Sequence, residues 1–234
     1  MMSGRMPGSR TVSMTSRLDH IVIAAKTLEE GSLYIRNALG VDIPPGGRHL
    51  FMGTHNLVMA IGEAVYLEVI AIDPTLDAPR HPRWFGLDDP YVRNWLQTSP
   101  RLLTWAINTP DLEALVVNSV VPPGEIVEAA RDDLRWKVAF REDGSMPAGG
   151  LLPLCIEWQT DFHPASRMTG SGWRLESLRL FHNRPQWLGE ALEAIEAIDE
   201  VEIHELDDRQ APYLEAILDG PQGPVAITGN DLSY

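Results

Sequence analysis

The chain has 234 residues and a mass of 26.0 kDa, enough for one large domain or two modest ones with a real core. Apolar residues make up 44% and charged residues 22%, and no apolar run approaches the roughly 18 residues of a membrane helix, so a soluble protein without membrane contact is expected. The net charge of −14 argues against a nucleic-acid partner, because phosphate backbones attract cationic proteins.

The amino-terminal seventeen residues carry three arginines, no acid and several Gly, Ser and Pro residues. They lack the apolar core of a signal peptide. Residues 1–16 are therefore expected to form a flexible leader, with Met14 as a candidate natural start.

Cys155 is the only cysteine, so no intrachain disulfide can form. This predicts a reducing, cytoplasmic location. Its apolar neighbours, Leu154 and Ile156, indicate a small buried hydrophobic residue rather than a nucleophile.

The first predicted unit covers residues 17–75. Residues 18–25 are apolar and partly β-branched, which predicts a strand, and Thr27 is a good N-cap for a helix that ends at Gly40. After a Pro-Gly break, glycine turns separate three further predicted strands. The order is β-α-β-β-β.

The same order recurs in residues 101–164, where a strand leads through Thr109-Pro110-Asp111 into a capped helix and three strands follow. A third, diverged copy is predicted in residues 173–234. There the letters Tyr213-Leu214-Glu215 repeat Tyr66-Leu67-Glu68. Residues 73–100 link the first two units, and the recurrence indicates that βαβββ is the repeating module.

At this point the sequence resembles the vicinal oxygen chelate superfamily, and within it the glyoxalase-like proteins. The residues that carry the resemblance are the opening strand at 18–23 and a Gly53-Thr54-His55-Asn56 turn placed before the strand Tyr66-Leu67-Glu68. The resemblance implies an α+β fold in which the paired modules of residues 17–164 form a curved mixed β-sheet, shaped as a cup around a metal. It also implies an enzyme of the lyase, isomerase or dioxygenase type that acts on a small oxygenated compound.

Burying an unpaired carboxylate is costly, so Glu68, inside an apolar strand, needs a partner. Side chains alternate along strands, and this alternation predicts that His20, Glu68 and Glu157 meet in the cup. In the metal-dependent members that the chain resembles, ligands come from the first and last strand of each module. The resemblance thus implies a site for Mn²⁺, Fe²⁺, Zn²⁺ or Mg²⁺ with metal ligands His20, Glu68 and Glu157, the two glutamates also being catalytic. The fourth position falls on Thr104, a poor ligand.

Other interpretations of these residues stay open. His20 can be a hydrogen-bonded structural histidine, and Glu68 can pair with an arginine. His55, Asn56 and His163 are candidates for substrate binding, although Asn56 can equally stabilise a turn. The competing function is a metal-free protein that binds a small hydrophobic molecule between Trp and Met side chains, and a third is a scaffold for a homodimer.

Overall fold

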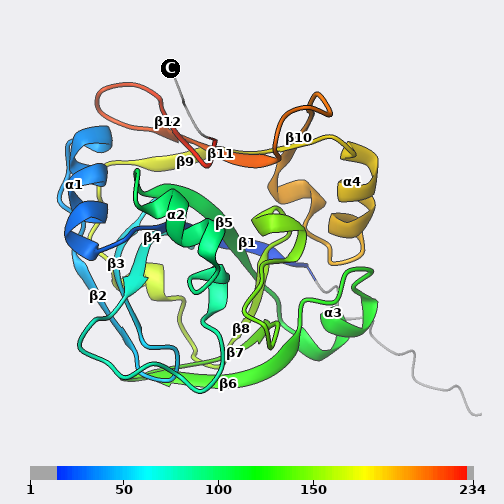
Figure 1. Ribbon diagram of the computed structural model, residues 1–234, viewed down its shortest axis with the longest axis horizontal. Helices are drawn as coiled ribbons and strands as arrows, with labels where there is room; N and C mark the ends of the chain where they lie inside the picture. The colour runs from blue at the N-terminus through cyan, green and yellow to red at the C-terminus, as the bar shows by residue number, and fades with distance from the viewer. Residues whose placement is uncertain (1–14, 231–234) are drawn as a thin grey trace, which may run out of the picture.

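The computed structural model describes residues 15–230, so nearly all of the predicted leader lies outside the described residues. The elements follow the predicted module order (Figure 1). The first unit contains β1 (Arg17–Ala24), α1 (Leu28–Leu39), β2 (Pro45–His49), β3 (Thr54–Ala60) and β4 (Tyr66–Ile72). The second contains β5 (Arg101–Asn108), α3 (Leu112–Asn118), β6 (Glu125–Arg131), β7 (Leu134–Phe140) and β8 (Leu154–Trp158). The C-terminal unit contains β9 (Arg174–His182), α4 (Pro185–Glu193), β10 (Glu202–Glu205), β11 (Tyr213–Asp219) and β12 (Val225–Thr228).

The first two units together form one strongly curved sheet with the strand order β2-β3-β4-β1-β5-β8-β7-β6. Within each unit the first and last strands pair in parallel, β1 with β4 and β5 with β8. The units join through the antiparallel pair of β1 and β5 at the centre of the sheet. The curvature brings the edge strands β2 and β6 into contact, so the sheet nearly closes into a barrel. The prediction of an α+β fold with paired βαβββ modules and a cup is confirmed.

Helix α1 begins and ends where the sequence predicts. The Thr27 side chain accepts a hydrogen bond from the Glu30 backbone N–H, and Gly40 closes the helix in the left-handed conformation at φ 69°. Gly31 faces β4, and a Cβ at this position would stand 2.3 Å from a Val69 methyl carbon. The absence of a side chain therefore lets α1 lie close against the convex face of the sheet.

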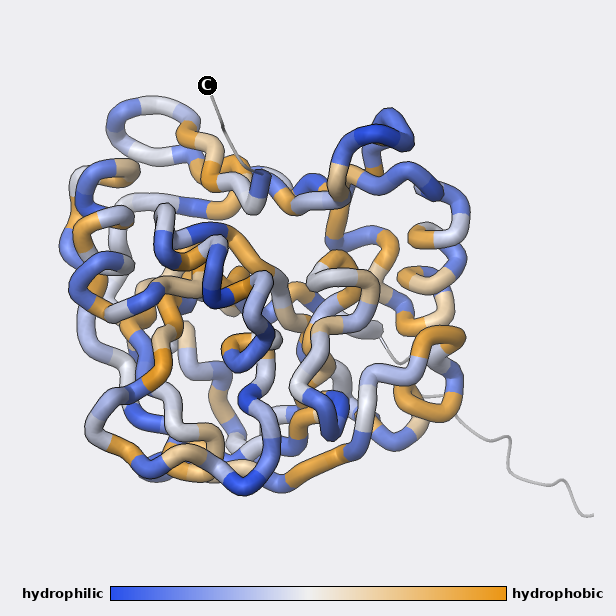
Figure 2. Tube along the Cα trace, in the orientation of Figure 1, coloured by the Kyte–Doolittle hydropathy of each residue, from blue (hydrophilic) through white to orange (hydrophobic). Residues whose placement is uncertain are grey.

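The main apolar core lies on the convex face, between the curved sheet, the helices and the C-terminal sheet. Ile21 and Ile23 of β1 point into it, while His20 and Val22 point to the concave side, as the alternation predicts. Cys155 is buried in this core, and burial raises the pKa of its thiol to about 12, which fits a structural residue. Figure 2 shows hydrophilic residues gathered in loops such as the one between β10 and β11.

The C-terminal unit repeats the order of elements but not their pairing. Its sheet has the order β10-β9-β11-β12, and the first strand, β9, pairs in parallel with the second strand, β10. In the two preceding units the parallel partner is the last strand. Leu180 of β9 and Leu214 of β11 are buried in the main core, so this sheet packs on the convex side, away from the cup. No helix in residues 15–230 is long and apolar enough to span a membrane.

The link between the first two units contains α2 (Pro90–Leu96) and a short 3-10 turn at Trp84–Gly86. Trp84 and Phe85 are buried against the concave side of the sheet with Val22 and Ile70. Arg83, also buried, forms an ion pair with Asp88 at 2.8 Å. The link therefore closes one side of the cup with aromatic rings.

Candidate active site

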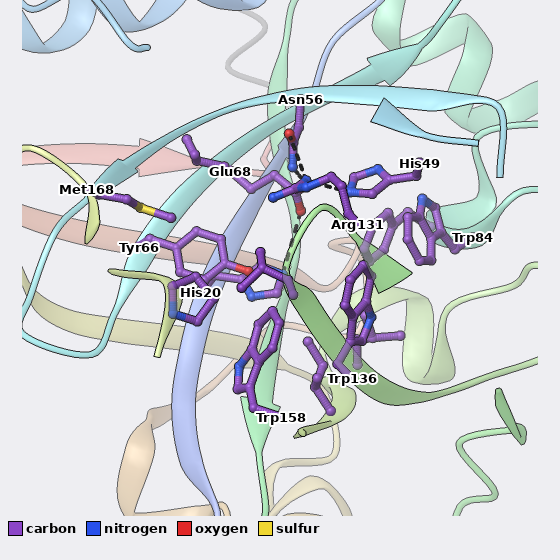
Figure 3. Close-up of a pocket in the computed structure, with 16 residues that line it drawn as sticks. His20, His49, Asn56, Tyr66, Glu68, Trp84, Arg131, Trp136, Trp158 and Met168 are labelled. Atoms are coloured by element: carbon purple, nitrogen blue, oxygen red, sulfur yellow. Dashed lines mark hydrogen bonds and ion pairs between the residues drawn. The ribbon is translucent and has the colours of Figure 1, made fainter. Parts of the chain in front are cut away.

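The concave face of the curved sheet contains a pocket of about 50 Å³ (Figure 3). The first unit contributes polar side chains to it, and the second unit contributes indole rings, aliphatic side chains and one cation. The residues that bear on its chemistry are His20, His49, Asn56, Tyr66, Glu68, Trp84, Arg131, Trp136, Ile156, Trp158 and Met168.

Asp19 lies behind the pocket, on β1, and is fully buried. Its Oδ1 accepts a hydrogen bond from Nδ1 of His20 at 2.6 Å. Its Oδ2 accepts from Nε1 of Trp158 at 2.7 Å, Nε2 of His163 at 2.9 Å and Nδ2 of Asn108 at 3.1 Å. Burial alone would raise the pKa of the Asp19 carboxyl, but the hydrogen bonds from His163 and His20 bring it below the ordinary value. The carboxylate is therefore ionised and fully satisfied.

The Asp19 carboxylate fixes the orientation of the His20 ring. Because an ionised carboxylate only accepts, Nδ1 of His20 carries the proton, and a neutral ring has its lone pair on Nε2. That Nε2 lies 3.6 Å from Oε2 of Glu68, and the ring stacks on Tyr66 with centroids 4.5 Å apart. Burial, followed by the charges of Asp19 and Glu68, raises the pKa of Tyr66 well above its ordinary value, so its hydroxyl stays protonated.

A second polar chain connects Glu68 to a cation on the opposite edge of the sheet. Nδ2 of Asn56 donates to Oε1 of Glu68 at 2.5 Å, and Oδ1 of Asn56 accepts from Nη1 of Arg131 at 3.4 Å. The same Nη1 lies 3.1 Å from Nε2 of His49, whose Nδ1 lies 3.0 Å from Oγ1 of Thr54. Burial, followed by the charge of Arg131, lowers the pKa of His49 to about 3. A neutral His49 can accept from Arg131 through Nε2.

The structure brings together only two of the three predicted metal ligands. His20 and Glu68 lie side by side on the paired strands β1 and β4 and line the pocket together, but Glu157 points to the convex side of β8. Its Oε2 accepts a hydrogen bond from the Leu112 backbone N–H at the start of α3, at 2.9 Å. Its Oε1 accepts from Gln159 at 2.5 Å. The predicted convergence of Glu157 with His20 and Glu68 is therefore wrong, because the neighbouring Ile156 occupies the concave side.

The other predicted site residues are separated by the same alternation. Asn56 points into the pocket, whereas His55, the residue before it in β3, lines a groove on the opposite face near α1. His163 lies behind Asp19, with Nε2 bonded to that carboxylate and Nδ1 accepting from the Ala165 N–H at 3.2 Å. Thr104 donates its hydroxyl to the Gly150 carbonyl at 2.9 Å. Their predicted roles toward a substrate stay predictions.

Comparison with known proteins decides the family. The model of the glyoxalase-like domain matches residues 18–196. The chain belongs to this family. The predicted membership of the vicinal oxygen chelate superfamily is thereby confirmed. No curated protein matches the chain.

Several solved structures are similar to this glyoxalase-like protein. A hypothetical protein from Staphylococcus aureus is 15% identical, with 92% of this chain and 85% of that chain covered and a TM-score of 0.54. A methylmalonyl-CoA epimerase variant from Streptomyces coelicolor is 18% identical over 64% of this chain and 98% of its own, with a TM-score of 0.38. A 4-hydroxymandelate synthase variant from the same organism is 16% identical over 92% and 62%, with a TM-score of 0.42. The first of these likenesses supports the fold alone.

The metal site that the superfamily implies is not matched by the donors in the cup. His20 and Glu68 supply two donors, but the second unit presents Ile156 at the third corner, and Thr104 bonds to a carbonyl. Arg131 also places a positive charge on the pocket wall, which opposes a cation. Within residues 15–230, no group of three or more His, Cys, Asp or Glu side chains is arranged to hold a metal ion. These residues do not fit the implied ligand set.

Sequence reasoning missed Arg131, His49 and the two indoles of Trp136 and Trp158. Arg131 is the last residue of β6, and strand alternation places it on the same face as Ala129, which is buried on the concave side. Trp158 follows Ile156 by two residues and shares its face. The missing signal was the pairing of the two sheet edges, which no local pattern contains.

Proposed function

We propose that this glyoxalase-like protein binds a small oxygenated compound and transfers a proton on it, with His20 rather than a bound metal as the reacting group. The observation that carries the proposal is the buried Asp19–His20 pair, which holds Nδ1 and leaves Nε2 facing the pocket at 3.6 Å from Glu68. A base that is oriented by a second group is the usual arrangement for general acid–base catalysis.

The residues support a simple proton transfer. Nε2 of His20 takes a proton from a carbon next to a carbonyl group. The electron pair of the C–H bond forms a C=C bond, and the π pair of the carbonyl moves to its oxygen, which gives an enolate. The charges of Asp19 and Glu68 stabilise the imidazolium that forms, since they lie on opposite sides of the ring. The proton then returns to the same or a neighbouring carbon. The outcome is an exchange, epimerisation or isomerisation, with no change in oxidation state.

The second candidate is a metal-free binding protein. The indoles of Trp84, Trp136 and Trp158, together with Tyr66 and Met168, favour it because they give the pocket a largely apolar wall. In that case the Asp19–His20 pair would orient a ligand without reacting with it. The two candidates share the pocket and differ in whether a proton moves.

Deuterium exchange distinguishes an enzyme that transfers a proton from a protein that only binds the ligand. The protein is incubated in D₂O with pyruvate, 2-oxobutyrate or hydroxyacetone, and loss of C–H signal is followed by proton NMR. We expect catalysed exchange that falls at least about 100-fold in His20→Gln, the typical contribution of a general base. The matched control is His204→Gln, because His204 lies on β10 in the C-terminal sheet.

The same exchange is also measured with EDTA and with added divalent metal ions. Exchange that is unchanged by EDTA supports the proposal. Exchange that appears only with added Mn²⁺, Fe²⁺ or Zn²⁺ would overturn it in favour of the metal-dependent prediction. Binding without exchange, read from a ligand-induced rise in melting temperature, would favour the binding protein.

A further inference from the structure

We propose that Arg131 anchors the carboxylate of a small monocarboxylic acid in the cup, an inference that rests on the proposed function and names its substrate class. Arg131 is the last residue of β6, an edge strand of the second unit, and it reaches across to β2 and β3 of the first unit. It is half-buried and lines the pocket with His20 and Glu68.

The guanidinium of Arg131 has no carboxylate within ion-pair distance among residues 15–230. Both of its hydrogen bonds use Nη1, and both go to neutral acceptors, His49 Nε2 and Asn56 Oδ1. The buried Arg83 differs, because it is paired with Asp88. Nε and Nη2 of Arg131 make no hydrogen bond within residues 15–230, and these donors match a planar, two-oxygen partner, the geometry in which arginine recognises carboxylates.

Two glycines of β2 make room for this arginine. A Cβ on Gly47 would stand 2.6 Å from Cδ and 2.8 Å from Nε of Arg131. A Cβ on Gly46 would stand 2.2 Å from Oδ1 of Asn56. The Gly47 N–H also donates to that Oδ1 at 2.8 Å. The absence of side chains at Gly46 and Gly47 thus leaves space for Asn56 and Arg131. A larger residue at either position would force these side chains to move.

A buried donor on the same wall also lacks a partner. Nε1 of Trp84 makes no hydrogen bond within the described part of the chain, although Trp84 is only 4% exposed. Its ring packs edge-on against His49, with centroids 5.0 Å apart, and His49 in turn contacts Arg131. Unpaired buried donors are rare, and Trp84 lines the same pocket as Arg131, so this indole N–H is a further donor next to the site.

Charge and size narrow the ligand further. Arg131 lines the same pocket as the Glu68 carboxylate, so a singly charged group is tolerated better than a dianion such as phosphate. A cavity of about 50 Å³ suits a compound of few non-hydrogen atoms. A small 2-oxo or 2-hydroxy monocarboxylic acid meets both conditions.

Tryptophan fluorescence reports occupancy, because three indoles line the pocket. The protein is titrated at constant ionic strength with sodium pyruvate, acetate and 2-oxobutyrate, and with the uncharged pyruvamide. We expect a carboxylate to bind at least about tenfold more tightly than pyruvamide. Arg131→Met should remove this preference, since a charge-assisted bidentate pair is lost. The control Arg135→Met should keep it, because Arg135 bonds to the Asp132 and Leu134 carbonyls outside the pocket.

Gly47→Ala gives an independent variant, because it moves Arg131 without removing its charge, and it should also weaken carboxylate binding. Equal affinity for pyruvate and pyruvamide, or an unchanged preference in Arg131→Met that unfolds like the wild type, would overturn the inference. Equal competition by chloride or inorganic phosphate would do so as well, by indicating an unspecific anion site. Carboxylate preference without deuterium exchange would remove the proposed function alone, and exchange without the preference would remove this inference alone.

Discussion

The two halves of the curved sheet share one topology and present opposite chemistry to the cup. The first unit contributes the polar groups His20, Asn56 and Glu68, and the second contributes Ile156 and two indoles with the single cation Arg131. Equivalent strands pair in the same way in both halves. The chemical difference therefore lies mainly in the side chains, and under the proposed function it divides the site into a reacting wall in the first unit and a binding wall in the second.

Asp19 links the two halves through side-chain hydrogen bonds, in addition to the backbone pairing of β1 and β5. It belongs to the first unit and orients His20, but three of its four donors, Asn108, Trp158 and His163, come from the second unit or its end. Removing a buried carboxylate that accepts this many hydrogen bonds lowers the stability of the fold, because its buried donors are left without an acceptor. Residues of the second unit therefore help to hold Asp19 and His20 of the first unit in place.

The largest predicted effect follows from removing this junction. Asp19→Ala should lower the free energy of unfolding by about 3–5 kcal/mol, because several buried donors lose their acceptor and His20 loses its orientation. Urea unfolding followed by fluorescence measures the change. Asp19→Asn should lie between Asp19→Ala and the wild type, since the amide keeps one acceptor oxygen.

A surface carboxylate provides the control for Asp19. Asp42 pairs with Arg36, and its side chain is 74% exposed, so Asp42→Ala should change stability far less. A loss below about 1 kcal/mol for Asp19→Ala would show that the four hydrogen bonds contribute little, and that the halves are held together by the β1–β5 pairing and apolar contacts.

The first half was largely predictable from the sequence. Its caps, its glycine turns and the alternation of β1 and β4 are local patterns, and they placed Ile21 and Ile23 in the core with His20 and Glu68 on the concave side. The repeat then predicted the second half. The unit order is thus encoded over short stretches of chain.

The faces of β8 were not predictable in this way. Leu154, Cys155 and Ile156 are all apolar, so the strand shows no alternation that tells one face from the other. Since a one-residue slip moves every side chain to the opposite face, Glu157 was assigned to the cup when it belongs to the convex side. The contact of Arg131 with β2 and β3 depends on closure of the whole sheet, which local patterns do not contain.

The next prediction concerns the pKa of His49, which lies on β2 of the first unit beside Arg131. The pKa of His49 is lowered to about 3 in the folded protein, against about 6.5 in an unfolded chain. Between these pH values His49 is protonated in the unfolded chain but neutral in the folded protein. The contribution of His49 to the free energy of unfolding is therefore fully present above about pH 6.5 and is lost progressively as the pH falls. The slope is at most about 1.4 kcal/mol per pH unit, or roughly 2 kcal/mol between pH 6.5 and 4.5.

Urea unfolding of the wild type and of His49→Gln at several pH values isolates this effect, because contributions from other groups cancel in the difference. The glutamine variant should show a shallower loss of stability over the same range, whereas His204→Gln should follow the wild type. Parallel curves for wild type and His49→Gln would mean that His49 takes up its proton in the folded state, which would place two positive charges together beside Asn56.

The smallest predicted effect separates the two glutamates that the sequence had grouped together. Glu157→Ala should cost about 1 kcal/mol of stability, because the Leu112 N–H at the start of α3 loses its acceptor, and it should leave deuterium exchange unchanged. Glu68→Ala should reduce exchange, since Glu68 stands 3.6 Å from His20 in the cup. Exchange rates that fall in Glu157→Ala and persist in Glu68→Ala would reverse this assignment, and would mean that the convex side of β8 takes part in the chemistry.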